Sequence, residues 1–89
     1  MDLDSLRKRL DALDEQIITL LSERARVIER VAHFKQQHHL PVHVPEREVA
    51  MIARMRGRNP GPLTGDAIER IYRAVLEEMR GLEHESFAR

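Results

Sequence analysis

The stretch LDSLRKRLDALDEQIITLLSERARVIERVAHF, from Leu3 to Phe34, decides the fold of this chain. Its apolar residues recur at alternating steps of three and four, the spacing that gathers them on one face of an α-helix. If Leu3 is position a of a heptad, Arg24 also falls at a, where a side chain faces a partner helix. The apolar series around it is Leu3, Leu6, Leu10, Leu13, Ile17, Leu20, Val27, Val31 and Phe34.

Two further cations, Arg7 and Lys35, fall at position e, on the flank of the same seam. A charge in such a place costs desolvation energy unless it is paired. The residues leave two interpretations of Arg24 open. It forms a buried ion pair or fixes helix register, as single polar a positions do in coiled coils, or it meets an anionic ligand.

The first helix is predicted to run without Gly or Pro to about Gln37, with Asp2, Asp4 and Ser5 supplying its N-cap and first turn. At 1.5 Å per residue it would be about 50 Å long. The rest of the chain is too short to cover a helix of that length. We therefore expect an obligate homodimer, in which a second copy covers the remainder.

The rest of the chain also predicts helices, so the expected fold class is all-α, with long, short and medium helices in an intertwined bundle dimer. Pro41 and Pro45 break the chain, and Pro45 suits the first position of a second helix that stops at Gly57. Thr64 is a good N-cap for a third helix, which is expected to fray somewhere after Glu83. Its expected apolar face is Ile68, Ile71, Tyr72, Val75, Leu76, Met79 and Leu82.

Composition bounds the class of protein. The 89 residues predict one domain over residues 1–89, and 15 basic against 15 acidic residues leave no net field to hold nucleic acid or a membrane surface. Cysteine is absent, no apolar run approaches the roughly 18 residues of a membrane span, and the start does not look like a signal peptide. We expect a soluble protein of the reducing cytoplasm.

Several charges converge on one end of the long helix. Lys35 lies about three turns after Arg24, and Arg47 and Glu48 open the second helix, which can fold back beside that end. Glu83 sits at helical spacing among apolar residues. Together they predict a basic pocket with an acid at one edge, suited to a small dicarboxylate.

The sequence offers no chemistry that depends on a nucleophile, a phosphate loop or a cofactor. It has no Cys, no evident Ser-His-Asp arrangement and no Gly-rich nucleotide fingerprint. His38, His39 and His43 lack the spacing of a zinc site, so we interpret them as a solvated turn and expect no metal. A reaction in the pocket would proceed by binding and electrostatics.

The chain resembles the all-helical class of chorismate mutases over nearly its whole length. The order and spacing of its motifs carry the resemblance: Leu6-Arg7, Leu13-Asp14, Leu20-Leu21-Ser22-Glu23-Arg24, Lys35, Pro45-Glu46-Arg47-Glu48, Asn59-Pro60-Gly61-Pro62 and the later helix with Glu83. The resemblance implies an intertwined dimer with two sites built from both chains. It also implies the rearrangement of chorismate to prephenate, without a cofactor, on the branch to phenylalanine and tyrosine.

By this resemblance each site residue has a role. Arg24 and Arg47 bind substrate carboxylate together with Arg7 of the other copy, Lys35 donates to the ether oxygen, and Glu48 holds the ring hydroxyl. Glu83 is expected to donate to the same ether oxygen, which an acid does only when protonated. We therefore expect turnover to fall as pH rises and Glu83→Gln to flatten that profile.

Two residues depart from the pattern of the relatives. Val44 stands where many have an acid, and little is lost if the contact there is made by the main chain. Met79 replaces a small polar residue, so one substrate carboxylate would lose a minor partner. Both are retained as expected substrate-binding positions.

Three other functions fit parts of the sequence. Isochorismate-pyruvate lyase shares the fold, but we expect an apolar residue there in place of Glu48. A weakly active domain that regulates or docks on another aromatic-pathway enzyme would gain activity with its partner. A simple dimerisation module would be stabilised by Arg24→Leu, whereas a substrate site would be destroyed.

Overall fold

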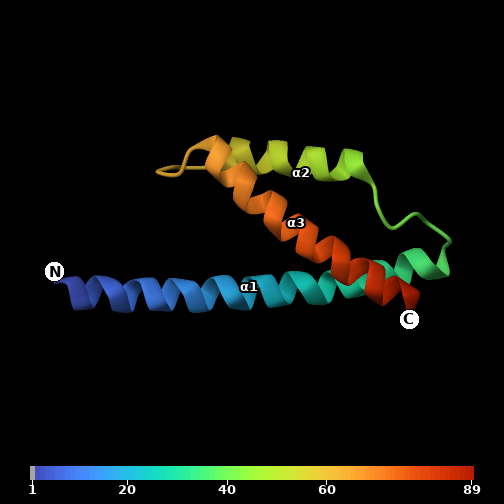
Figure 1. Ribbon diagram of the computed structural model, residues 1–89, viewed down its shortest axis with the longest axis horizontal. Coiled ribbons are helices and arrows are strands. Elements are labelled where there is room, and N and C mark those ends of the chain that lie inside the picture. Colours follow the sequence, from blue (N-terminus) through green and yellow to red (C-terminus); the bar gives the residue numbers. More distant parts are fainter. Residues whose placement is uncertain (1) are drawn as a thin grey trace.

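A computed structural model describes residues 2–89, which form three α-helices (Figure 1). They are α1 (Leu3–Gln37), α2 (Pro45–Arg58) and α3 (Gly65–Ala88). This confirms the predicted all-α class and the order of long, short and medium helices. None of the three helices is long and apolar enough to cross a membrane.

The helix N-termini are capped as the sequence predicts. The Asp2 carboxylate accepts a hydrogen bond from the backbone N–H of Ser5 at 2.8 Å, and the Thr64 hydroxyl accepts one from Ala67 N–H at 3.1 Å. Pro45 occupies the first turn of α2, where its missing N–H leaves no intrahelical bond unmade. Local sequence thus fixes where each helix begins.

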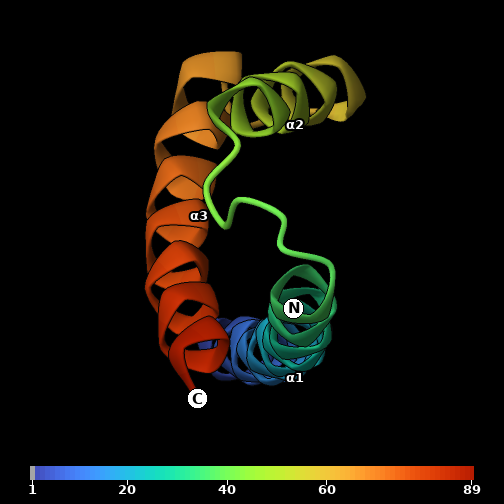
Figure 2. The same cartoon turned by 90° about the vertical axis from the view of Figure 1, so that its right-hand side faces the viewer.

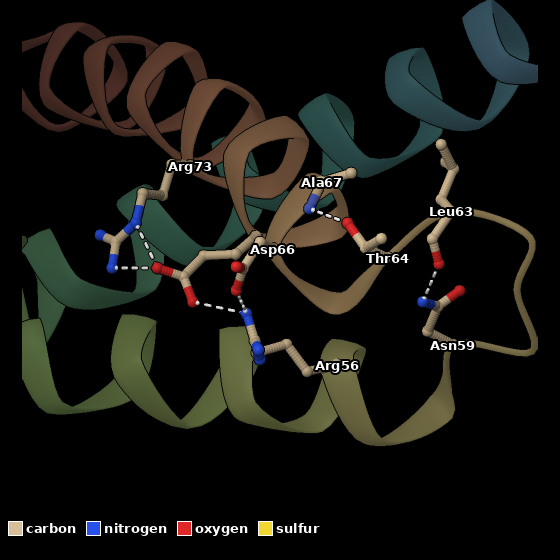
Figure 3. Close-up of polar contacts among 8 residues, drawn as sticks. Arg56, Asn59, Leu63, Thr64, Asp66, Ala67 and Arg73 are labelled. Carbon is tan, nitrogen blue, oxygen red and sulfur yellow. Dashed lines mark hydrogen bonds and ion pairs between the residues drawn. The ribbon is translucent and has the colours of Figure 1, made fainter.

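The end of the second helix differs from the prediction. The second helix does not stop at Gly57 but continues to Arg58, with Asn59 as its C-cap. The side-chain amide of Asn59 donates to the Leu63 carbonyl at 2.6 Å (Figure 3). Its side-chain oxygen accepts from Gly61 N–H at 3.0 Å, so Asn59 organises the turn. Gly61, with φ of 78°, supplies the left-handed conformation that the turn needs.

The third helix runs on past Glu83 to Ala88, and its last turn packs against the end of α1. The Gln36 side chain donates to the Phe87 carbonyl at 2.9 Å, and Ser86 is fully buried there. This packing holds the last turn and places Glu83 inside the helix rather than at a solvated end.

Helix α3 connects the other two helices. It packs against both, whereas α1 and α2 lie at its two ends and meet through side chains that reach into the space between them. Figure 2 shows this arrangement along the long axis, with α2 at one end of α3 and α1 at the other. The buried apolar residues lie on these contacts: Ala32, Ile52, Leu76 and Met79.

The N-terminal half of α1 has no covering helix. Figure 1 shows α3 crossing α1 only toward its C-terminal end. Leu10, on the predicted seam, is 59% exposed. Apolar residues exposed along this half are Leu3, Leu6, Leu10, Leu13, Ile17, Ile18 and Leu20. In residues 2–89 no second element packs on this half of the helix.

Charged side chains tie α2 to the start of α3. Arg56 donates to Asp66 at 2.8 Å and to Glu69 at 3.2 Å, and Glu69 also accepts from Arg73 (Figure 3). The hydrogen bond from Arg56, together with its positive charge, holds the pKa of Asp66 below its ordinary value of 3.8. The exposed position of Asp66 means that water and salt screen the pair.

This ion pair predicts an acid-dependent loss of stability. A carboxyl whose pKa is lowered by folding stabilises the protein above its ordinary pKa of 3.8, and that contribution disappears as pH falls through the lower folded value. We expect Asp66→Asn to reduce the free energy of unfolding slightly at pH 7 and to make less difference near pH 2. Urea unfolding at both pH values measures the difference.

The matched control is Asp11→Asn, which makes the same change at a residue without an ion pair among residues 2–89. An equal loss of stability at pH 7 in both variants, or an Asp66→Asn effect that persists unchanged at low pH, would contradict this account of the pair.

Candidate active site

A cavity of about 210 Å³ opens between the three helices. The C-terminal half of α1 forms one wall, the segment 42–44 and the start of α2 form another, and α3 closes the third side. Seven of the eight residues expected to act on or bind substrate line it: Arg24, Lys35, Val44, Arg47, Glu48, Met79 and Glu83. The structure therefore brings together residues that lie up to 59 positions apart in the chain.

Arg24 reaches into this cavity from the apolar face of α1. Its Nη2 lies 3.6 Å from the Met51 sulfur, a weak acceptor, and its Nη1 is buried without any hydrogen-bond partner among residues 2–89. No carboxylate of this chain forms an ion pair with it in those residues. The observed surroundings thus leave a desolvated guanidinium donor unmatched, which is the costly state for a buried cation.

Lys35 is held by two acceptors from different parts of the chain. Its Nζ donates to the Val42 carbonyl at 2.7 Å and to Glu83 Oε2 at 2.6 Å. Both side chains of the ion pair are largely buried, with exposed fractions of 18% for Lys35 and 11% for Glu83. An ammonium has three donors, so one proton of Lys35 remains available for another acceptor in the cavity.

Glu48 forms an ion pair with Arg80, a residue that the sequence prediction missed. Arg80 Nε donates to Glu48 Oε1 at 3.0 Å and Arg80 Nη2 to Oε2 at 2.9 Å, a bidentate pair between α2 and α3. His43 Nε2 lies farther away, 3.6 Å from Oε2. Helical spacing could have identified Arg80, because it stands four residues after Leu76 and three before Glu83, on the same side of α3.

Of the remaining predicted site residues, three line the cavity and one, Arg7, does not. Val44 and Met79 line the cavity, and Arg47 lines it from an exposed position in the first turn of α2. Arg7 is exposed near the N-terminus of α1, about 25 Å along the helix from Arg24. Within one chain, Arg7 does not take part in the cavity.

The residues around the cavity define what it can do. It offers four cations, from Arg24, Lys35, Arg47 and Arg80, and two carboxylates, of which Glu83 is paired with Lys35 and Glu48 with Arg80. Such a site binds and orients a small polyanion and places a cation near a developing negative charge. In residues 2–89 no group of three or more His, Cys, Asp or Glu side chains is arranged to hold a metal ion.

Comparison with known proteins adds the family. Residues 6–84 match the family model of chorismate mutase type II. Among curated proteins, the chain is 36% identical over 86 residues to a bifunctional chorismate mutase/prephenate dehydratase of Aquifex aeolicus. The match covers 92% of this chain and 24% of that relative, so the chain spans about a quarter of the length of such bifunctional relatives.

Shorter relatives and solved structures agree with this match. A chorismate mutase of Methanocaldococcus jannaschii is 37% identical over 54 residues, which is 61% of this chain and 54% of that protein. The structure of chorismate mutase (form II) from Thermus thermophilus superposes with a TM-score of 0.90 at 30% identity, covering 92% of this chain and 93% of that one.

Chorismate mutase from Helicobacter pylori, solved in complex with prephenate, has a TM-score of 0.87 at 28% identity and covers 97% of this chain and 93% of that one. Sequence and structure comparisons thus agree over nearly all of the described residues. The chain belongs to the chorismate mutase type II family.

Proposed function

We propose that this chain converts chorismate to prephenate and that it does so as a homodimer with two shared sites. The observation that carries the proposal is the unmatched guanidinium of Arg24 at a cavity that also contains Lys35. Membership of the family supports it, as does the similarity to a Helicobacter pylori enzyme whose structure contains prephenate. A substrate with two carboxylates would supply the acceptors that Arg24 lacks.

The reaction is an intramolecular rearrangement. The ether C–O bond of chorismate breaks while a C–C bond forms between the enolpyruvyl arm and the ring, with no proton gained or lost overall. The protein must hold the arm over the ring, which is a problem of orientation and entropy. It must also stabilise the negative charge that grows on the ether oxygen as the C–O bond lengthens.

The cavity residues divide these tasks. Arg24 and Arg47 hold substrate carboxylate, and the available proton of Lys35 is directed to the ether oxygen. The Glu48 carboxylate accepts a hydrogen bond from the ring hydroxyl of the substrate. Val44 and Met79 contribute main-chain and apolar contacts. The clamp of the Val42 carbonyl and Glu83 around Lys35 supports its role, because it fixes the ammonium before substrate arrives.

The uncovered half of α1 supports the proposed dimer. A second copy laid along this apolar face would bury the exposed leucines and bring its own Arg7 toward the cavity. The exposure of Leu10 at 59% and the distance of Arg7 from its own cavity support this arrangement. We also propose that residues 1–89 act as a single domain in the cytoplasm. A second aromatic-pathway enzyme, such as the dehydratase to which the curated relatives are joined, is its candidate partner.

The direct test is loss of chorismate absorbance on adding the purified protein, with prephenate identified as the product. Turnover to prephenate is the expected result. Formation of pyruvate from isochorismate, with no action on chorismate, would instead assign the lyase.

Lys35→Ala is expected to lower kcat by about two to three orders of magnitude, since it removes a donor to the developing oxyanion. The measurement is the initial rate at saturating chorismate, together with circular dichroism to show that the helices persist. Lys8→Ala, on an exposed face of the same helix, is the control and should retain the full rate. An active Lys35→Ala protein would end the assignment of Lys35.

Shared sites predict that two inactive variants rescue each other. In a mixed dimer of one Arg7→Ala chain and one Arg24→Ala chain, one site has both arginines and the other has neither. Random pairing at equal amounts should restore about a quarter of the wild-type rate, because half of the dimers are mixed. The measurement is the rate after the chains are unfolded and refolded together.

Lack of recovery in the refolded mixture, with dimers present by light scattering, would refute the contribution of Arg7 from the other copy. A mass of one chain, 10.4 kDa, in an active sample would refute the dimer itself.

Glu83→Gln tests whether Glu83 donates to the ether oxygen. A glutamine donates at any pH, whereas a carboxyl donates only when protonated, so kcat of the variant should vary less with pH than that of the wild-type protein. The kcat–pH profiles of the two proteins between pH 5 and about 9 decide this. Identical profiles would leave Glu83 solely as the acceptor that orients Lys35.

A further inference from the structure

The bidentate pair between Arg80 and Glu48 joins α3 to the first turn of α2 at the wall of the cavity. Its two hydrogen bonds, at 3.0 and 2.9 Å, use two nitrogens of the guanidinium and both oxygens of the carboxylate. This fork geometry fixes the plane of the carboxylate as well as its position. Neither the His43 imidazole, at 3.6 Å, nor any other basic side chain of residues 2–89 holds Glu48 in this way.

The cations around the cavity explain why the Glu48 carboxylate needs to be held. Glu48 lines the same cavity as three cations that must face a dianionic substrate: Arg24, Lys35 and Arg47. A carboxylate free to swing would be attracted to those cations and would compete with the substrate for them. It would also repel the substrate. Engagement by Arg80 holds the carboxylate at the wall and offsets its charge there.

The position of the pair is also specific. His43, Glu48, Leu76 and Arg80 line both the substrate cavity and a second cavity on the far side, between α2 and α3. Arg80 therefore approaches Glu48 from within the wall that separates the two cavities. A carboxylate oxygen has more than one lone pair, so each oxygen held by Arg80 can still accept from a substrate hydroxyl.

We infer that Arg80 is a positioning residue that holds the Glu48 carboxylate in place to accept the ring hydroxyl of the substrate. This inference rests on the proposed function, in which Glu48 contacts that hydroxyl. Arg80 acts through Glu48 and not on the reacting atoms. Because the hydroxyl is held before and during the rearrangement, the loss of Arg80 should weaken substrate binding more than it slows the chemical step.

The test is a double-mutant cycle on the dimeric, full-length chain with chorismate as substrate. Arg80→Met should reduce kcat/KM by roughly 10- to 100-fold, the range that a misplaced site residue brings, and mainly through KM. In the Glu48→Gln background the same substitution should change kcat/KM by less than about twofold, because its target carboxylate is already gone.

Two further variants separate positioning from folding. Arg80→Lys keeps a charge but not the fork, so it should recover only part of the loss. If Arg80→Met does not fold, Arg80→Lys takes its place in the cycle. Arg73→Met makes the same change two turns earlier on α3, where Arg73 pairs with Glu69, and it should leave kcat/KM unchanged.

Each outcome decides the matter. A large KM effect of Arg80→Met that vanishes in the Glu48→Gln background supports the positioning role. An effect of equal size in both backgrounds, or none in either, overturns the positioning role of Arg80. The proposed function remains intact in that case if the wild-type protein turns over chorismate. A wild-type protein without activity on chorismate refutes the proposed function instead.

Discussion

The guanidinium of Arg24 is the constraint on which the rest of the structure depends. A cation placed among leucines and valines on the apolar face of α1 must find acceptors, yet its Nη1 is buried and without a partner in residues 2–89. Folding a chain around such a group is unfavourable unless a ligand completes its surroundings. Such a break with the usual rules of core packing is typical of a functional site, and here it lies at the wall of the cavity.

Helix α3 holds the other two helices together and forms one side of the cavity beside Arg24. It packs against both other helices, and one side of it carries Met79, Arg80 and Glu83 to the cavity. Each acid of the cavity is paired with a cation from another element, Glu83 with Lys35 and Glu48 with Arg80. Of the cavity's cations, Arg24 and Arg47 take part in no ion pair among residues 2–89.

Much of the fold and of the site could be predicted from the sequence, and particular residues show which features could be predicted and which could not. Helical periodicity identified α1, and its single charged seam position identified Arg24. Caps and prolines placed the starts of all three helices. Lys35, Glu48 and Glu83 were expected near one end of α1, and the structure places them there.

What the sequence could not supply depends on contacts between elements. Arg80 and Glu48 lie 32 residues apart, and only the packing of α3 against α2 shows that they pair. The second helix was predicted to stop at Gly57, but α2 continues to Arg58, where the backbone N–H of Asn59 bonds to the Arg56 carbonyl. The last turn of α3, which ends at Ala88, depends on packing around the buried Ser86. The role of Arg7 depends on a second copy, so neither one sequence nor one chain can fix it.

A crystal structure of the protein bound to prephenate would test the central claim most directly. The account predicts a dimer in which a carboxylate of the product lies within hydrogen-bond distance of Arg24 Nη1, with Arg7 of the other copy at the same site. Prephenate bound elsewhere, or Arg24 neutralised by a carboxylate of the protein itself, would contradict it.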